Sequence, residues 1–309
     1  MRVIFFGTAA YAVPSLERLA AAGHTLALCV TQPDRRQGRG LTPQPSPVKQ
    51  AAARLGVNMA QPERLDGRAL AGVEADVGVV AAYGQLIRRE VLELPARGVI
   101  GVHPSLLPKY RGAAPVAWAL LNGETQTGTT IFQLDERLDA GPILSQRALA
   151  IEPSHTTATL TERLAGMGAE ELVKTLEALE AGRITPRPQE ESNATYAPKL
   201  TKAQGVIDWA QTASAIERLV RATLPWPGAS TTWAGQSLKV CAADVEPGPR
   251  AEEPGTVVAV SSSALTVATG DGRLLIRELQ PAAGRRLRVG EFLAGHRVRS
   301  GDRLGARAW

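Results

Sequence analysis

The chain has 309 residues, of which 44% are hydrophobic and 21% are charged. This length suggests two domains, and this composition excludes an intrinsically disordered chain, a collagen-like chain and a coiled coil. No window of about 18 consecutive apolar residues occurs, so we expect no transmembrane helix and no membrane partner. The formal net charge is +5, which permits a nucleic-acid partner without requiring one.

Two features of the sequence bear on the compartment. The apolar run at residues 3–6 is shorter than the about 7–15 residues of a secretory signal, so we interpret it as a buried strand. Cys29 and Cys241 lie far apart in apolar segments, so we expect neither a disulfide framework nor a cysteine-rich zinc site. A cytoplasmic location fits this cysteine usage.

Strand-like and helix-like segments alternate through the first two-thirds of the chain. Apolar residues at helical spacing follow the first strand, and a long amphipathic helix is predicted over residues 157–182. Buried strands are predicted at residues 3–6, 26–30, 77–82, 99–102 and 127–134. This alternation predicts a Rossmann-like α/β domain over residues 1–188, with a mostly parallel sheet and helices on both faces.

The last part of the chain has a different pattern. A proline-containing stretch without apolar periodicity predicts a linker over residues 189–205. Within residues 206–309 one helix is predicted at 213–222. Short strands separated by turn signals are predicted at residues 230–233, 238–242, 255–260, 265–268 and 274–279. Short strands at this spacing predict a smaller, OB-like β-barrel domain.

Two polar residues follow predicted strands of the first domain. His103 comes just after the strand at 99–102, and Asp139 lies in a loop after the strand at 127–134. If these strands are adjacent and parallel, their carboxyl ends place the two side chains together. A carboxylate beside an imidazole fixes its tautomer and favours its charged form, so such a pair can transfer protons. A lone histidine after a strand is, however, more often structural than catalytic.

The same segments carry a resemblance to a known family. HPSLLPKYRGAAP at residues 103–115 and LDERLDAGPIL at 134–144 resemble the folate-dependent formyltransferases. QPDRRQGRG at 32–40, IDW at 207–209 and PWPGA at 225–229 resemble the branch that acts on methionyl-tRNA. The resemblance extends over nearly the whole chain.

This resemblance implies a reaction and its participants. The family moves a formyl group from 10-formyltetrahydrofolate onto a primary amine, here the α-amino group of methionyl initiator tRNA, with no metal and in a monomer. His103 matches the catalytic histidine, which polarises the formyl group and transfers protons, and Asp139 matches its carboxylate partner. The residues that match folate-contacting segments are Ser105, Leu106, Leu107, Pro108, Tyr83, Gly84, Gln85, Leu86, Ile87 and Asp135.

One position departs from the family pattern. Gly101 stands where the family has a catalytic asparagine, whose amide donates a hydrogen bond to the formyl oxygen. Loss of one such donor typically lowers the rate by about 10²–10³-fold. We hypothesise that His103, with a water or a backbone N–H, covers the oxygen instead. The rival hypothesis is a folate- or tRNA-binding relative with impaired catalysis.

Basic residues suggest where RNA would bind. Arg35, Arg36 and Arg39 lie in a long polar loop at residues 32–47, which in the resembled family enters the acceptor stem of the tRNA. An arginine-rich stretch at 273–307 suggests a phosphate-facing surface, although such a stretch is often only a solvated face. The remaining candidates for tRNA contact are Lys199, Lys202, Arg285 and Arg286.

Two other enzyme classes can be weighed against this interpretation. Residues 7–12 lack the G-x-G-x-x-G pattern, which argues against a nicotinamide dehydrogenase. A sugar-nucleotide N-formyltransferase could share the fold but has no need of an arginine-rich loop, and it remains the alternative within the family.

Overall fold

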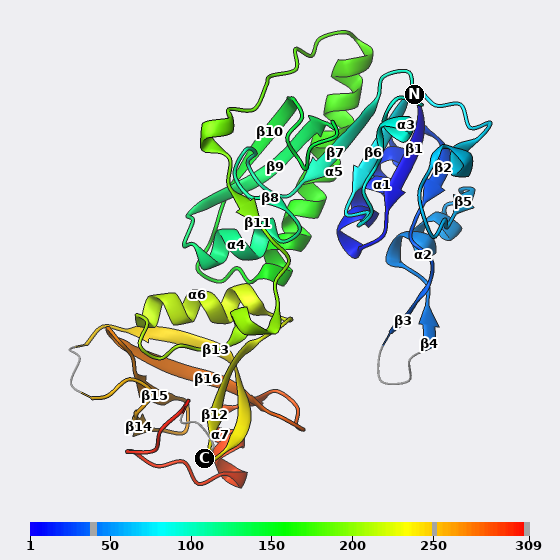
Figure 1. Cartoon of the computed structure of the whole chain (residues 1–309). Coiled ribbons are helices and arrows are strands. Elements are labelled where there is room, and N and C mark those ends of the chain that lie inside the picture. Colours follow the sequence, from blue (N-terminus) through cyan, green and yellow to red (C-terminus); the bar gives the residue numbers. More distant parts are fainter. Residues whose placement is uncertain (38–41, 249–251, 306–309) are drawn as a thin grey trace. The chain divides into compact units, whose positions relative to one another are not determined.

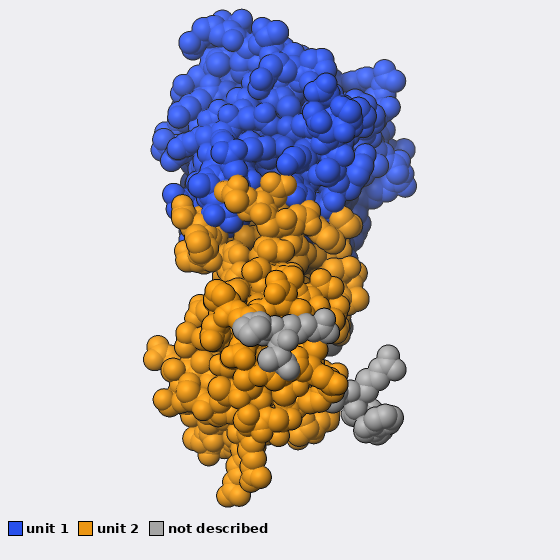
Figure 2. Space-filling model, turned by 90° about the vertical axis from the view of Figure 1, so that its left-hand side faces the viewer, with its two compact units in different colours: residues 1–115, 126–151, 160–197 blue, residues 116–125, 152–159, 198–309 orange. Residues whose placement is uncertain are grey.

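The protein is described here from a computed structural model, in which residues 1–37, 42–248 and 252–305 are described (Figure 1). These residues form two compact units (Figure 2). The first unit contains residues 1–115, 126–151 and 160–197, and the second contains residues 116–125, 152–159 and 198–309. Residues 116–125 and 152–159 thus leave the first unit and return to it, which no sequence pattern indicated.

The first unit is built on a seven-stranded sheet with the order β10-β9-β7-β6-β1-β2-β5. Its strands are β1 (Arg2–Gly7), β2 (Thr25–Val30), β5 (Met59–Ala60), β6 (Val77–Ala81), β7 (Val99–His103), β9 (Gln126–Gln133) and β10 (Ile143–Ala150). The five strands from β7 to β5 are parallel, which confirms the predicted α/β sheet. Apart from Arg2 and His103 at their ends, β1 and β7 consist of buried apolar residues and glycine, as expected for strands covered on both faces of the sheet.

The two strands that flank the predicted catalytic residues do not run as expected. β9 is antiparallel to β7, and β10 is antiparallel to β9. The expectation that His103 and Asp139 follow adjacent parallel strands is therefore wrong. The connection from β7 to β9, which contains the short helix at residues 115–121, returns the chain antiparallel to β7, and the loop at 134–142 must fold back to bring Asp139 towards His103.

The helices of the first unit include one long, well-predicted element. Its α-helices are α1 (Val13–Ala21), α2 (Pro47–Arg54), α3 (Arg89–Leu92) and α5 (Thr157–Glu180). The apolar stripe of α5 is buried, as its periodicity predicted. α2 was not predicted, because it has only eight residues; it begins where the Ser46 side chain accepts a hydrogen bond from the Lys49 amide.

The order of the strands reverses at β1, and this marks the carboxyl-end edge of the sheet as an expected ligand site. β1 pairs with β2 on one side and with β6 on the other, so the chain direction across the sheet reverses at β1. In open α/β sheets, ligands bind outside the carboxyl ends of strands at such a point. Here the Thr8 hydroxyl, after β1, donates a 2.8 Å hydrogen bond to the Tyr83 carbonyl, after β6. β7 ends at the same edge with His103.

The second unit is an antiparallel sheet with three helices. Its helices are α4 (Pro115–Leu121), α6 (Ala213–Thr223) and α7 (Val289–Gly295). Its strands are β12 (Ala229–Trp233), β13 (Gln236–Glu246), β14 (Val257–Val260), β15 (Leu265–Ala268), β16 (Arg273–Pro281) and β17 (Leu287–Arg288). The main sheet has the order β12-β13-β16-β15-β14, and its buried face packs with α6 and α7 into one apolar core. Bridges from Trp233 to Leu304 and from Thr256 to Arg303 connect the two edges of the sheet to one segment. The prediction of a second domain built on β-strands is confirmed, and its OB-like character stays a prediction.

Two small sheets were not predicted. β3 (Arg35–Gln37) pairs with β4 (Thr42–Gln44), so the segment predicted as a polar loop contains a two-stranded hairpin. β8 (Arg111–Gly112) pairs in parallel with β11 (Tyr196–Ala197), which lies within the segment predicted as a linker.

Among the described residues, no helix has the length and apolar character that crossing a membrane requires. Nor do these residues gather three or more histidine, cysteine or acidic side chains in a way that could hold a metal ion.

Candidate active site

The structure brings His103 and Asp139 together. The Nδ1 atom of His103 lies 3.7 Å from Oδ2 of Asp139, and the histidine side chain is 8% exposed. Its Nε2 atom lies 2.8 Å from the carbonyl oxygen of Tyr110. Because a carbonyl oxygen only accepts hydrogen bonds, Nε2 carries the hydrogen and Nδ1 faces the carboxylate. In the neutral imidazole, Nδ1 is therefore the atom that can accept a proton.

A short segment fixes both members of this pair. Tyr110 accepts the hydrogen bond from His103, and two residues later the backbone N–H of Gly112 donates a 2.8 Å hydrogen bond to Oδ2 of Asp139. Tyr110 and Asp139 both have positive φ, at 63° and 49°. Non-glycine residues in this region carry backbone strain and occur mainly where the surrounding structure enforces them, often at functional sites.

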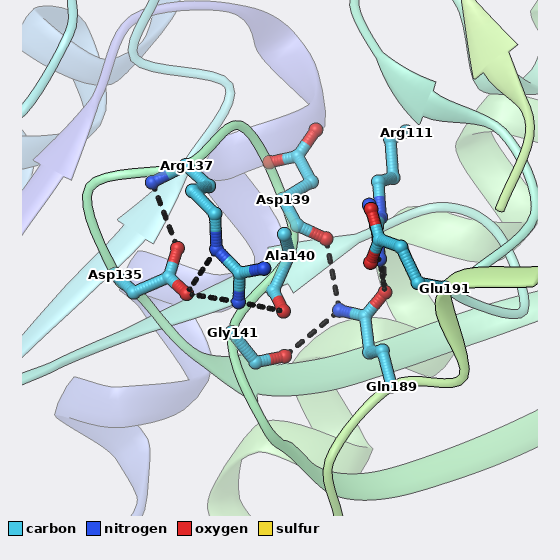
Figure 3. A network of polar contacts seen from close by, with 8 residues as sticks. All are labelled: Arg111, Asp135, Arg137, Asp139, Ala140, Gly141, Gln189 and Glu191. Atoms are coloured by element: carbon cyan, nitrogen blue, oxygen red, sulfur yellow. Dashed lines mark hydrogen bonds and ion pairs between the residues drawn. The ribbon is translucent and has the colours of Figure 1, made fainter.

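The loop that carries Asp139 is held by a polar network (Figure 3). The Gln189 amide donates hydrogen bonds of 2.8 Å to the carbonyl oxygens of Asp139 and Gly141. Its oxygen accepts from the buried Arg111 guanidinium, which also forms a bidentate ion pair with Glu191. This ion pair lowers the pKa of the Glu191 carboxyl below its usual value.

The position that lacks the expected amide is filled by an aromatic ring. Gly101 and Phe132 are directly opposite in the β7–β9 ladder. A Cβ atom on Gly101 would lie 2.5 Å from Cε1 of Phe132 and 2.8 Å from Cδ1 of Leu134. The Phe132 ring also meets the His103 ring edge to face, with centroids 6.4 Å apart. An asparagine side chain therefore has no room at residue 101 in this structure.

Comparison with known proteins assigns the chain to a family. Residues 1–176 match the formyl transferase domain, and residues 199–297 match the formyl transferase carboxyl-terminal domain. The chain belongs to the formyltransferase family. It is 46% identical to a methionyl-tRNA formyltransferase of Roseiflexus castenholzii, with 99% of each chain covered. It is also 46% identical to the methionyl-tRNA formyltransferase of Chromobacterium violaceum, over 99% of this chain and all of that protein.

Solved structures of other proteins share the fold. An N-formyltransferase from Helicobacter canadensis, in complex with folinic acid and dTDP-3-aminofucose, superposes with a TM-score of 0.67 at 15% identity, covering 92% of this chain and 99% of that one. HypX from Aquifex aeolicus, in complex with tetrahydrofolic acid, gives 0.63 at 20% identity over 97% of this chain and 50% of that one. At these identities the likeness shows the fold alone.

The first family segment matched to folate contact follows His103. Ser105 is buried and donates a 2.6 Å hydrogen bond to the Lys109 carbonyl. Leu107 is buried against Phe132, and its backbone is held by Thr130 and Gln146. Leu106 is partly exposed, and the bond before Pro108 is cis. The side chains of Ser105 and Leu107 therefore contact other residues of the protein and are not exposed to a ligand.

The second matched segment follows β6. Tyr83 and Ile87 are buried in the core, and burial raises the pKa of Tyr83 to about 12. The Gln85 amide is bound to the backbone of residues 62–65. Gly84 has positive φ, and Leu86 is 68% exposed. In this segment the exposed Leu86 side chain, rather than the buried Tyr83 and Ile87 side chains, is accessible to a ligand.

The loop with Asp139 faces the second segment. Asp135 forms an ion pair with Arg137 at 2.9 Å, and Leu138 is 58% exposed. Leu134, at the start of this loop, packs against the apolar cluster that contains Tyr83 and Ile87. The loop therefore lies near the segment that carries Leu86.

The candidate tRNA-binding residues lie in three places. Arg35 is exposed on β3, Arg36 lies in the same strand, and Arg39 lies outside the described residues. Lys199 and Lys202 are exposed at the start of the long carboxyl-terminal segment of the second unit. Arg285 pairs with Glu291 at 3.0 Å, and Arg286 pairs with Glu278. Acidic partners therefore offset part of the charge excess that the sequence suggested.

The sequence interpretation missed the residues that hold the pair in place. Arg111 and Gly112 stand within the KYRGAAP motif, but nothing in the motif shows what they contact. Phe132 looked like an ordinary apolar strand residue. Gln189 gave no signal, because it lies in a segment without periodicity and joins Asp139 across 50 positions of the chain.

Proposed function

We propose that this protein transfers the formyl group of 10-formyltetrahydrofolate to the α-amino group of methionyl initiator tRNA. The observation that carries the proposal is the His103–Asp139 pair, with Nδ1 and a carboxylate oxygen 3.7 Å apart at the carboxyl-end edge of the sheet. Identity of 46% over 99% of both chains with a relative named methionyl-tRNA formyltransferase supports the choice of substrate.

The arrangement of His103 suits the proton transfers of this reaction. An α-amino group has a pKa of about 7.7–8.0, so an attacking amine at neutral pH needs a nearby base. His103 presents Nδ1 to it, because the Tyr110 carbonyl holds the hydrogen on Nε2. As the amine nitrogen bonds to the formyl carbon, Nδ1 takes its proton, and Asp139 stabilises the resulting imidazolium.

The reaction is completed by returning that proton. The bond between the formyl carbon and the folate nitrogen breaks, and protonated His103 supplies the proton that this nitrogen needs. Since Gly101 offers no side-chain donor, the oxygen of the tetrahedral centre depends on His103 and on a backbone N–H or a water.

The residues near the pair fit a folate as co-substrate. A pterin needs an apolar slot with a few polar groups. Leu86 and Leu138 are large apolar side chains that are 68% and 58% exposed, and Leu138 directly precedes Asp139 in the chain. We propose that these two leucines and the backbone around Gly84 contact the folate.

The proposal is tested with the full chain, methionyl initiator tRNA and 10-formyltetrahydrofolate. We expect mass spectrometry of the aminoacyl end to detect formylmethionine. A parallel reaction offers a dTDP-amino sugar. Formylation of the sugar without formylation of the tRNA would overturn the proposal in favour of the sugar-nucleotide alternative. No transfer to either acceptor would overturn it in favour of an impaired relative.

The catalytic assignment makes a separate prediction. His103→Gln removes the proton acceptor, and Asp139→Asn removes the charge that stabilises the imidazolium. We expect each variant to lower kcat by about 10²–10⁴-fold, the usual contribution of a positioned acid–base group. The check is the initial rate of tRNA formylation by folded variants. Rates within threefold of the unaltered protein, for either variant, would show that the pair is structural.

A further inference from the structure

Two residues of the short segment 110–112 contact the catalytic pair, one on each member, and the residue between them reaches Gln189. The Tyr110 carbonyl binds His103, and the Gly112 amide binds the Asp139 carboxylate. Between them, the Arg111 side chain is 1% exposed and reaches Gln189 through Nε and Nη2, at 3.1 and 3.0 Å. The segment thus contacts Asp139 in two ways, directly through Gly112 and indirectly through Gln189.

The Gln189 side chain uses its full hydrogen-bonding capacity at this point. Its two N–H groups donate to the carbonyl oxygens of Asp139 and Gly141, each at 2.8 Å (Figure 3). Its oxygen accepts from Arg111, which only donates, so the orientation of the amide is fixed. The amide therefore ties down the loop on both sides of the residue that carries the carboxylate.

Asp139 needs such support. Its φ of 49° is unfavourable for a residue with a Cβ, and its loop must turn back against the antiparallel strand β9. The Oδ2–Nδ1 separation of 3.7 Å is longer than a hydrogen bond, so no direct bond to His103 holds the carboxylate in place. Its position depends on the Gly112 amide and on the hydrogen bonds to its backbone.

We infer that Gln189 is a positioning residue for catalysis, oriented by Arg111 and acting through Asp139. The inference rests on the proposed function. Misplacement of a reacting group by about 1 Å can lower a rate by about 10²-fold, so loss of two hydrogen bonds to this loop slows the chemical step. Binding of the tRNA depends on other segments and changes little, whereas the folate, which we propose contacts Leu138 of the same loop, is bound less tightly.

The test uses Gln189→Glu in the full chain. A glutamate keeps the shape of the side chain and still accepts from Arg111, but it cannot donate to the two carbonyl oxygens. We expect kcat for tRNA formylation to fall by about 10–100-fold, with KM for the tRNA within about threefold. Gln236→Glu, at an exposed hairpin position of the second unit, adds the same charge and is expected to leave kcat unchanged.

A double-mutant cycle separates positioning from general structural support. If Gln189 acts through Asp139, Gln189→Glu changes the single-turnover rate of the Asp139→Asn variant by less than about threefold. If Gln189→Glu lowers the rate by the same factor with and without Asp139, the inference is wrong. Gln189→Leu serves as a second variant should Gln189→Glu fail to fold.

These outcomes are distinct from failure of the proposed function. Absence of tRNA formylation by the unaltered chain overturns that function. An unaltered chain that formylates tRNA, beside a Gln189→Glu variant that does so equally fast, overturns only the role of Gln189.

Discussion

At the scale of single residues, Gly101 and Phe132 act as one unit. They face each other across β7 and β9, where cross-strand neighbours pack closely. The glycine lets the ring lie over the strand, and the ring then fills the space where a side chain at residue 101 would project. The ring also supports the edge of His103. A substitution at Gly101 or Phe132 therefore alters the packing of the other residue and of His103.

This pairing predicts the effect of restoring an asparagine. Gly101→Asn alone forces the Phe132 ring away, and we expect it to destabilise the protein by about 1–3 kcal/mol, the usual range for overpacking, and to lower the formylation rate. Gly101→Asn with Phe132→Leu relieves the clash. We expect the double variant to be more stable than the single one and faster than Phe132→Leu alone, since an oxyanion donor contributes about 10²–10³-fold.

Thermal unfolding and steady-state kinetics of the three variants check this prediction, with Phe132→Leu as the control for loss of the ring. A single Gly101→Asn variant that is as stable as the unaltered protein and more active would contradict it.

The sequence predicted the groups that carry out the chemistry, but not the residues that hold those groups in place. His103 and Asp139 could be predicted because proton transfer requires such groups after strands and because the surrounding motifs resemble a known family. Gln189 and Arg111 could not, because they interact across 78 positions and their hydrogen bonds depend on where β8 and β11 bring the chain. Backbone groups such as the Gly112 amide leave no trace in the sequence at all.

At the scale of elements, the close approach of α5 to the sheet sets the position of β7. At Gly168, a Cβ atom would lie 2.9 Å from Cγ1 of Val102 and 3.0 Å from Oγ1 of Thr129. Val102 directly precedes His103, so this contact lies next to the catalytic strand end. Gly166, one half-turn earlier in the same helix, is exposed and has no atom within 4 Å of its Cβ position.

The two glycines predict opposite responses to one substitution. Gly168→Ala pushes the helix away from the sheet, and we expect it to reduce the free energy of unfolding by about 1–3 kcal/mol. Gly166→Ala adds a better helix former in open space, and we expect a gain of about 0.5–1 kcal/mol. Urea unfolding of both variants measures the difference. Changes of the same sign would show that α5 does not pack as closely as described.

The elements themselves were predictable where the apolar pattern was long. The central strands and α5 carry continuous or periodic apolar residues, whereas β8 and β11 are two residues each and have no pattern to detect. The predicted direction of β9 was wrong, because an apolar run indicates that a strand is buried but not whether it runs parallel or antiparallel to its neighbour. Only the connection before it, α4 and a short turn, decides that it runs antiparallel to β7.

At the scale of the whole molecule, the basic residues behind the net charge of +5 differ in whether an acidic residue already pairs with them. Several arginines of the carboxyl-terminal stretch are held by acids, among them Arg277 by Asp244 and Arg286 by Glu278. Within the described ranges, Lys199 and Lys202 are exposed and have no acidic partner at ion-pair distance. A phosphate can meet these lysines without first displacing a carboxylate, so we propose that they contribute more to RNA binding than the paired arginines.

Salt dependence measures this difference. The affinity for RNA falls with salt in proportion to the number of phosphates that a protein neutralises, and loss of one such contact lowers the logarithmic slope by about one. We expect Lys199→Ala and Lys202→Ala each to lower the slope by about one between about 50 and about 200 mM salt. Arg286→Ala should lower it less, because its charge is already offset by Glu278. Lys174→Ala, on an exposed position of α5, removes the same charge elsewhere and should leave the slope unchanged. Equal slopes for all four variants and the unaltered protein would show that RNA binds through other residues.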